Sequence, residues 1–241
     1  MIGIINFTHS DPLYSAIRRK DIIVRESPAK ILGMILDDEL DGGMVSLVSL
    51  IENGLNLSRG ANIHSISTTM STILVSRGKQ MGKDMEIAVT SHTRTTELYT
   101  EMVLKGLGIN YKMIHADETY AEDLLSIADY ALVIGDEALR VYGSGLRILF
   151  DTGYEFSRLY HLQPLYAALA YKGVSEPDDM EAVNEAVHPS REDIESSVGE
   201  ASEKLGLDPG LMRRYYSFIR YDYPPHLDRT VEFVRKHLGR S

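Results

Sequence analysis

MEIAVTSHTRTTELYTEMVLKGLGINYKMIHADETYAEDLLSIADYALVIG (85–135) decides the fold class of this 241-residue chain. The segment alternates short apolar runs with helical stretches. It predicts strands at 85–89, 111–115 and 130–135, with helices over 91–105 and 120–128. Strands and helices in this order are typical of a parallel sheet with helices on both faces. We therefore predict an α/β protein.

The chain on either side extends this pattern and then changes it. Before the segment, strands are predicted at MIGII (1–5), DIIV (21–24), GMVSLVSL (43–50, a strand or a strand plus a turn), NIHSIS (62–67) and TILVS (72–76), and helices over 11–20 and 27–38. After Asp151, PLYAALAY (164–171) is predicted to be a strand that returns toward the first part of the chain. Residues 177–238 are predicted to be helical, because apolar residues recur there at three- and four-residue spacing.

This order predicts two lobes, each a mostly parallel sheet flanked by helices. The first lobe would hold residues 1–77 plus 165–241, and the second would hold residues 84–160. Crossings near 78–83 and 161–166 would act as a hinge, with a ligand bound in the cleft between the lobes. A single doubly wound sheet without a cleft is the alternative.

Composition excludes several classes of function. With 35 acidic and 25 basic residues the formal charge is −10, which disfavours nucleic acid as a partner and requires any anion site to be built locally. The absence of cysteine excludes disulfides, thiolate metal sites and cysteine nucleophiles. No stretch approaches the ~18 consecutive apolar residues of a membrane span, and the first residues do not resemble a signal peptide. We expect a cytoplasmic protein without membrane association.

The strongest local motif is TSHTRTT (90–96), which lies between a predicted strand and a predicted helix. Helix N-terminal N–H groups favour an anion. Hydroxyls of Thr93, Thr95 and Thr96 could add donors, and the Arg94 guanidinium could pair with a carboxylate through two hydrogen bonds. Ordinary N-capping by Ser91 or Thr93, with Arg94 in solvent, is the alternative interpretation.

A second motif, IGDEALR (134–140), also joins a strand to a helix. Gly135 would allow a ligand to approach the backbone, and Asp136 would cap the helix and face the same cleft. A purely structural cap is the alternative interpretation.

Polar residues also follow the predicted strands of the first lobe. His9 follows the first strand, Ser46 and Ser49 lie in the third predicted strand, and Ser71 precedes TILVS. A histidine at the end of a strand is often a structural residue rather than a base. Nucleophile-elbow, H-E-x-x-H, P-loop and dinucleotide motifs do not occur in the sequence, so we expect neither a metal nor a cofactor.

Eight motifs in register resemble the chorismate dehydratases of the futalosine route to menaquinone, and cover nearly the whole chain. They are DPLY (11–14), DELDGGMVS (38–46), MSTILVSR (70–77), HTRTT (92–96), LVIGDEAL (132–139), DTGYEF (151–156), LQPLYAAL (162–169) and IRYDY (219–223). The match at 132–139 is the most specific. A sister family with the same fold, the dihydroxynaphthoate synthases, differs in that stretch.

The resemblance implies a periplasmic-binding-protein-like type II fold and a cofactor-free lyase. Chorismate would lose water and become 3-[(1-carboxyvinyl)oxy]benzoate. Two family positions carry most of the function: a serine that corresponds to Ser71, and an asparagine that is replaced here by His9. Ser46 also replaces a proline of the family pattern.

On this basis Ser71 and His9 are the predicted catalytic residues, on the wall opposite Thr93–Thr96. Ser46, Gly135 and Asp136 would contribute to binding of a small-molecule carboxylate. A dihydroxynaphthoate synthase or diverged lyase, and a non-catalytic binding protein for a small carboxylate, are the alternatives. The tyrosines between 215 and 223 would pack in the core or form a dimer contact, so the protein would be a monomer or a homodimer.

Overall fold

The computed structural model describes residues 1–91 and 93–239 and divides the chain into two compact units. Unit 1 comprises Met1–Ser65 and Leu165–Ser241, and unit 2 comprises Ile66–Pro164. The boundary between Pro164 and Leu165 agrees with the predicted start of the returning strand. The boundary between Ser65 and Ile66 corrects the predicted boundary at residue 77, because residues 66–77 belong to unit 2.

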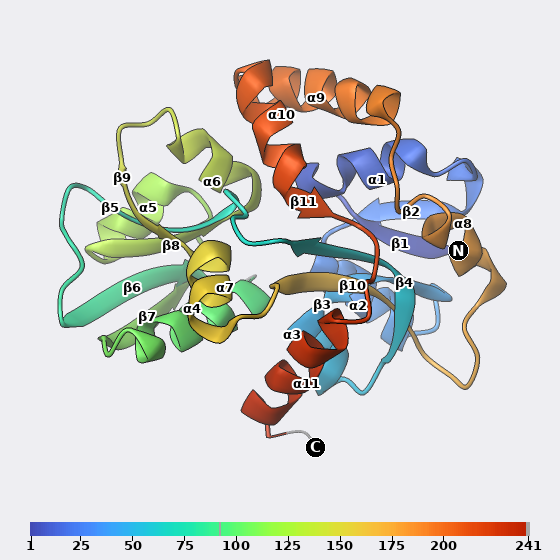
Figure 1. Cartoon of the computed structure of the whole chain (residues 1–241), viewed down its shortest axis with the longest axis horizontal. Coiled ribbons are helices and arrows are strands. Elements are labelled where there is room, and N and C mark those ends of the chain that lie inside the picture. The colour runs from blue at the N-terminus through green and yellow to red at the C-terminus, as the bar shows by residue number, and fades with distance from the viewer. Residues whose placement is uncertain (92, 240–241) are drawn as a thin grey trace. The chain divides into compact units, whose positions relative to one another are not determined.

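The sheet of unit 1 has the strand order β11-β4-β10-β3-β1-β2 (Figure 1). Its strands are β1 (Ile2–Ile5), β2 (Ile23–Glu26), β3 (Gly42–Ser46), β4 (Asn56–Ser65), β10 (Leu165–Tyr171) and β11 (Ile219–Arg220). β1 pairs in parallel with β2 and β3, whereas β10 is antiparallel to both β3 and β4. The carboxyl ends of β1, β3 and β4 therefore lie at one edge of the sheet, together with the start of β10.

The helices of unit 1 cover this sheet and its edges. They are the α-helices α1 (Asp11–Ala16), α2 (Pro28–Leu36), α3 (Leu47–Glu52), α8 (Glu181–Asn184), α9 (Arg191–Leu205), α10 (Pro209–Phe218) and α11 (Leu227–His237), and the 3-10 helices η1 (Thr8–Ser10), η2 (Lys20–Ile22) and η3 (Asp178–Met180). The packing of α9 against α1 and α10 can be followed in Figure 1. The predicted helical region 177–238 is interrupted by the short strand β11.

The predicted strand GMVSLVSL (43–50) is wrong in its second half. β3 ends at Ser46, and α3 begins at Leu47. Ser46 caps this helix because its Oγ accepts a hydrogen bond from the Ser49 N–H at 3.1 Å. The apolar side chains of α3 are buried at helical spacing, which an apolar run alone does not distinguish from a strand.

The sheet of unit 2 has the strand order β7-β6-β8-β5-β9. Its strands are β5 (Thr72–Ser76), β6 (Asp84–Thr90), β7 (Asn110–Ala116), β8 (Tyr130–Ile134) and β9 (Arg147–Asp151). The predicted strand–helix–strand segment forms the parallel part, β6 with β7 and β8. β5 completes this sheet as an antiparallel partner of β8 and β9, which is why residues 66–77 belong to this unit.

Helices cover the sheet of unit 2 as predicted for this fold class. They are α4 (Thr95–Gly106), α5 (Ala121–Ile127), α6 (Gly135–Val141) and α7 (Thr152–Tyr160). α5 and α6 pack on a face that includes Ile73, Val75 and Val133. α4 and α7 pack against each other (Figure 1). The ring centroids of Tyr99 and Phe156 lie 4.2 Å apart. Across the described residues, no helix is both long and apolar enough to span a membrane.

Candidate functional site

Most of the predicted site residues lie at one edge of the unit 2 sheet. The carboxyl ends of β6, β7 and β8 meet there, and the antiparallel strand β5 begins there, because Thr72 pairs with Ile134. Ser71 precedes β5 at this edge, next to the start of α6. This corrects the prediction that Ser71 belongs to the same lobe as His9: Ser71 lies in unit 2 with the 93–96 and 134–140 motifs, and His9 lies in unit 1.

The backbone of Ser71 is tied directly to the start of α6. Its carbonyl oxygen accepts a hydrogen bond from the Gly135 N–H at 2.8 Å, and the Ser71 residue is only 5% exposed. Gly135 has φ +61°, in the left-handed region that favours glycine. No heavy atom lies within 4 Å of a Cβ built there, so the requirement for glycine comes from the backbone rather than from crowding.

A partly buried carboxylate holds the turn immediately before Ser71. Asp151, the last residue of β9, accepts hydrogen bonds from the N–H groups of Thr69 at 3.1 Å and Met70 at 2.6 Å. It also caps α7, accepting from the Tyr154 N–H at 2.9 Å. Burial raises the pKa of Asp151, and the backbone N–H donors oppose that shift by stabilising the charged form. DTGYEF (151–156) is one of the eight motifs of the resemblance, and no role was predicted for Asp151.

The N-terminus of α4 carries the predicted threonine hydroxyls. Thr93, Thr95 and Thr96 are all buried, whereas Arg94 is exposed. The alternative interpretation, in which Ser91 or Thr93 caps this helix, does not hold, because α4 begins at Thr95 and its cap residue is Arg94, without a side-chain capping bond. Residue 92, within the HTRTT motif, lies outside the described residues.

An acidic side chain lies in the first turn of α4, beside the predicted anion site. Glu97 Oε1 lies 2.6 Å from Nε2 of His115 on β7. Burial raises the pKa of Glu97, whereas its hydrogen bond to His115 and the charge of Arg94 lower it. A ligand carboxylate at this helix would therefore face the Glu97 charge as well as the donors, and Arg94 would offset part of that repulsion.

Asp136 does not cap α6 as predicted. The helix begins at Gly135, its cap residue is Ile134, and Asp136 lies in the first turn, where the helix dipole favours an acidic side chain. Asp136 is partly buried.

In unit 1, His9 lies in η1, which is the next element after β1 in the chain. Its carbonyl oxygen accepts a hydrogen bond from the hydroxyl of Tyr221 at 2.8 Å, and the Thr8 carbonyl accepts one from Tyr216 at 3.2 Å. Burial raises the pKa of Tyr221 well above its ordinary value, so this hydroxyl remains a donor. Tyr215, Tyr216 and Tyr221 are buried, in agreement with the core-packing interpretation of the tyrosine cluster.

Ser46 also lies at the carboxyl edge of the unit 1 sheet, but its hydroxyl is occupied by local contacts. Besides capping α3, Ser46 Oγ donates a hydrogen bond to Ser49 Oγ at 2.8 Å. These two serines therefore define the start of α3. Substrate binding by Ser46 stays a prediction.

His64 is a buried histidine outside the predicted site residues. This histidine lies near the end of β4 and is 2% exposed, with Nδ1 2.9 Å from Asn62 Oδ1. Burial lowers its pKa to about 4, so the imidazole is neutral at pH 7. The available signal in the sequence was the alternation of Asn62 and His64 with Ile63. In a strand this alternation places the two polar side chains on one face and Ile63 on the other.

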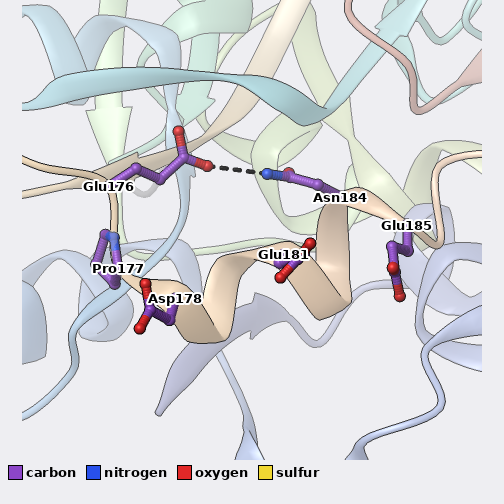
Figure 2. A pocket seen from close by; sticks show the side chains of 6 residues that line it. All are labelled: Glu176, Pro177, Asp178, Glu181, Asn184 and Glu185. Atoms are coloured by element: carbon purple, nitrogen blue, oxygen red, sulfur yellow. Dashed lines mark hydrogen bonds between the residues drawn. The ribbon is translucent and has the colours of Figure 1, made fainter.

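A pocket in unit 1 is lined by residues of the 176–185 segment, remote in sequence from every predicted site residue (Figure 2). Its lining is Glu176, Pro177, Asp178, Glu181, Asn184 and Glu185. Figure 2 shows the hydrogen bond from Asn184 Nδ2 to Glu176 Oε1, which measures 2.9 Å. Four carboxyl groups would repel an anionic ligand, so this pocket does not suit a carboxylate. Across the described residues, His, Asp and Glu side chains form no group of three or more suited to a metal ion.

Comparison with solved structures shows the fold. The structure is similar to protein AF1704 from Archaeoglobus fulgidus, with 16% identity and a TM-score of 0.69 over 99% of this chain and 97% of that chain. It is also similar to the alkanesulfonate-binding protein SsuA from Xanthomonas axonopodis pv. citri, with 14% identity and a TM-score of 0.72 over 99% and 91%. A Candida albicans protein with the generic periplasmic binding protein fold, CA3427, matches at 12% identity and a TM-score of 0.55 over 91% and 80%. The predicted periplasmic-binding-protein-like α/β fold is confirmed.

Comparison of the sequence with family models shows the family. A search among curated proteins gave no match. The model of a family described as menaquinone biosynthesis matches residues 1–238. The chain therefore belongs to the menaquinone biosynthesis family, as the eight motifs predicted.

Proposed function

We propose that this protein is a carbon–oxygen lyase that converts chorismate to 3-[(1-carboxyvinyl)oxy]benzoate and water. Membership of the menaquinone biosynthesis family supports a role in that pathway. The observation that favours the dehydratase is the placement of Ser71, which lies beside the start of α6 at the edge that carries the anion-binding motif of α4.

The proposed reaction breaks one C–O bond and one C–H bond of the chorismate ring. The leaving hydroxyl and the ring proton depart together as water, and the electron pair of the C–H bond enters the aromatic ring. Aromatisation makes the step strongly downhill, so the protein needs to orient the ring, accept a proton and assist the leaving hydroxyl. We assign Ser71 to contact with the reacting hydroxyl or proton.

Chorismate carries two carboxylates, and the N-terminus of α4 is suited to hold one of them. Because the formal charge of the chain is −10, binding of an anion requires a local concentration of hydrogen-bond donors. Backbone N–H groups of the first turn, the hydroxyls of Thr93, Thr95 and Thr96, and the Arg94 guanidinium are the proposed donors. SsuA, which shares the fold, is described as an alkanesulfonate-binding protein bound to MOPS.

His9 favours one specific alternative, the dihydroxynaphthoate synthase. An imidazole donates a hydrogen bond as the family's asparagine does, but it also accepts a proton near neutral pH. The Tyr221 hydroxyl holds the His9 backbone, and the His9 ring makes an edge-to-face contact with Phe7, with 5.8 Å between the ring centroids. In the dehydratase, we assign His9 to a hydrogen bond with the substrate.

The test is to incubate the purified protein with chorismate, without added metal or nucleotide, and to identify products by chromatography and mass spectrometry. We expect a product lighter by one water, lost in Ser71→Ala. Ser126→Ala is the matched control, because Ser126 is exposed and its hydroxyl bonds only within α5, to the Asp123 carbonyl. Conversion of cyclic dehypoxanthine futalosine with chorismate left intact would establish the synthase. Chorismate binding without turnover would establish a binding protein.

A further inference from the structure

We propose that Asp151 is a positioning residue for Ser71, a role that rests on the dehydratase function proposed above. Its carboxylate would hold the Thr69–Met70 turn in the conformation that directs the Ser71 side chain toward the substrate. This assigns a function to the DTGYEF motif.

The first support is the conformation of Met70. Its φ of +60° lies in the left-handed region, which side chains other than glycine rarely adopt and which persists only where surrounding contacts enforce it. The Asp151 carboxylate supplies those contacts, through its 2.6 Å hydrogen bond from the Met70 N–H and its bonds from the Thr69 N–H. Met70 immediately precedes Ser71, so its ψ angle sets the direction in which the Ser71 residue leaves the turn.

The second support is that Ser71 is fixed from its other side as well. The Gly135 N–H binds its carbonyl oxygen, and Ile73, two residues later, pairs with Asp151 across the β5–β9 ladder. The turn, the start of β5 and the end of β9 are therefore joined in one hydrogen-bond network around Asp151. Displacement of the turn would move Ser71 by changing the backbone dihedral angles that precede it, while leaving β5 in register.

Capping of α7 is the competing explanation for Asp151, and a serine separates the two roles. Ser is a good N-cap, so Asp151→Ser retains a bond to the Tyr154 N–H. The shorter side chain does not span both the helix and the turn, and the Thr69 and Met70 N–H groups lose their charged acceptor. Asp208→Ser is the matched control, because Asp208 also caps a helix, accepting from the Leu211 N–H at 3.1 Å, and has no bond to the turn.

The activity experiment compares these variants on chorismate. For Asp151→Ser we expect kcat to fall about 10- to 100-fold, as for a catalytic group displaced by about 1 Å, with KM changed less than about threefold. Asp208→Ser should retain wild-type kcat. In a Ser71→Ala background, Asp151→Ser should cause no further loss, because it acts through the hydroxyl already removed. Multiplicative losses in the double variant would overturn the positioning role.

Amide hydrogen exchange tests the turn independently of any substrate. In Asp151→Ser, the amides of Thr69 and Met70 should exchange roughly tenfold faster or more, whereas those of α7 should stay protected. Unchanged exchange at both turn amides would overturn the proposal. If the wild-type protein leaves chorismate intact, the dehydratase function fails, and the exchange result still decides whether Asp151 holds the turn.

Discussion

Protonation of His64 should destabilise unit 1 in mild acid. Burial lowers the pKa of this imidazole to about 4 in the folded protein, against 6.5 for an ordinary histidine. Between these values the unfolded chain binds a proton that the folded chain excludes, so the free energy of unfolding falls as the pH falls. The stabilising contribution is fully present above about pH 6.5 and is lost as the pH approaches about 4.

The size of this effect follows from the difference in pKa. At about 1.4 kcal/mol per pKa unit, the fall from 6.5 to about 4 corresponds to about 3 kcal/mol once the loss is complete. About 2 kcal/mol of that loss is expected by pH 5. His64 is 2% exposed, and its Nδ1–H donates a hydrogen bond to Asn62 Oδ1, so little water is available to solvate a charged ring.

The measurement is urea unfolding followed by circular dichroism at several pH values between 7.5 and 4.5, for wild type and His64→Asn. The amide of Asn can take the place of the imidazole Nδ1 and does not titrate. We expect the variant to be less stable at pH 7.5 because it is smaller, and the difference from wild type to shrink by about 2 kcal/mol at pH 5. His188→Asn, at an exposed position, is the control and should follow the wild-type curve. A stability difference that does not change with pH would refute the reasoning.

Three further substitutions test the two sheet edges. Gly135→Ala should lower the melting temperature through about 1–2 kcal/mol of destabilisation, because φ is +61° there, and should reduce turnover by displacing the N–H that binds Ser71. Tyr221→Phe removes the buried donor to the His9 carbonyl and should cost about 1–3 kcal/mol in urea unfolding. Arg94→Ala should weaken chorismate binding about two- to fivefold by calorimetry, since an exposed ion pair contributes little, and should leave the melting temperature unchanged.

Each substitution has a matched control in the same unit. Gly108→Ala, with φ +70° and equally open surroundings, should destabilise like Gly135→Ala but retain full turnover. Tyr223→Phe removes a partly buried hydroxyl that binds Asp228, and should cost less than Tyr221→Phe. Arg158→Ala removes an exposed arginine from α7 and should leave affinity unchanged. Unchanged affinity in Arg94→Ala would remove that residue from the proposed anion site.

Elements with a clear local signal could be predicted from the sequence. β6, β7 and β8 and the intervening helices follow from periodicity, because apolar runs of strand length alternate with helical segments. The helix that begins at Pro28 follows from its Ser27 cap, whose side chain accepts from the Lys30 N–H. Such signals are local, since the residues that specify each element lie within it.

Long-range pairing accounts for the main error in the predicted site. TILVS (72–76) is an apolar run buried throughout, and nothing in its own composition indicates which sheet it joins. Its ladder with β8 assigns it to unit 2 and brings Ser71 to Gly135, 64 positions further along the chain. Asp151 shows the same limitation, because its bonds to Thr69 and Met70 join residues that are about 80 positions apart in the sequence and are visible only in the fold.

Because Ser71 lies in unit 2, the proposed contact with the reacting hydroxyl or proton depends on the sheet of that unit. The register of a single sheet, through Thr72 paired with Ile134 and Ile73 paired with Asp151, fixes Ser71 relative to the start of α6. The N-terminus of α4 follows β6 in that same sheet, so the proposed carboxylate donors share this framework. Substitutions that loosen the unit 2 sheet should therefore affect anion binding and turnover together. His9 belongs to unit 1, and its replacement should alter turnover while leaving the donors of α4 intact.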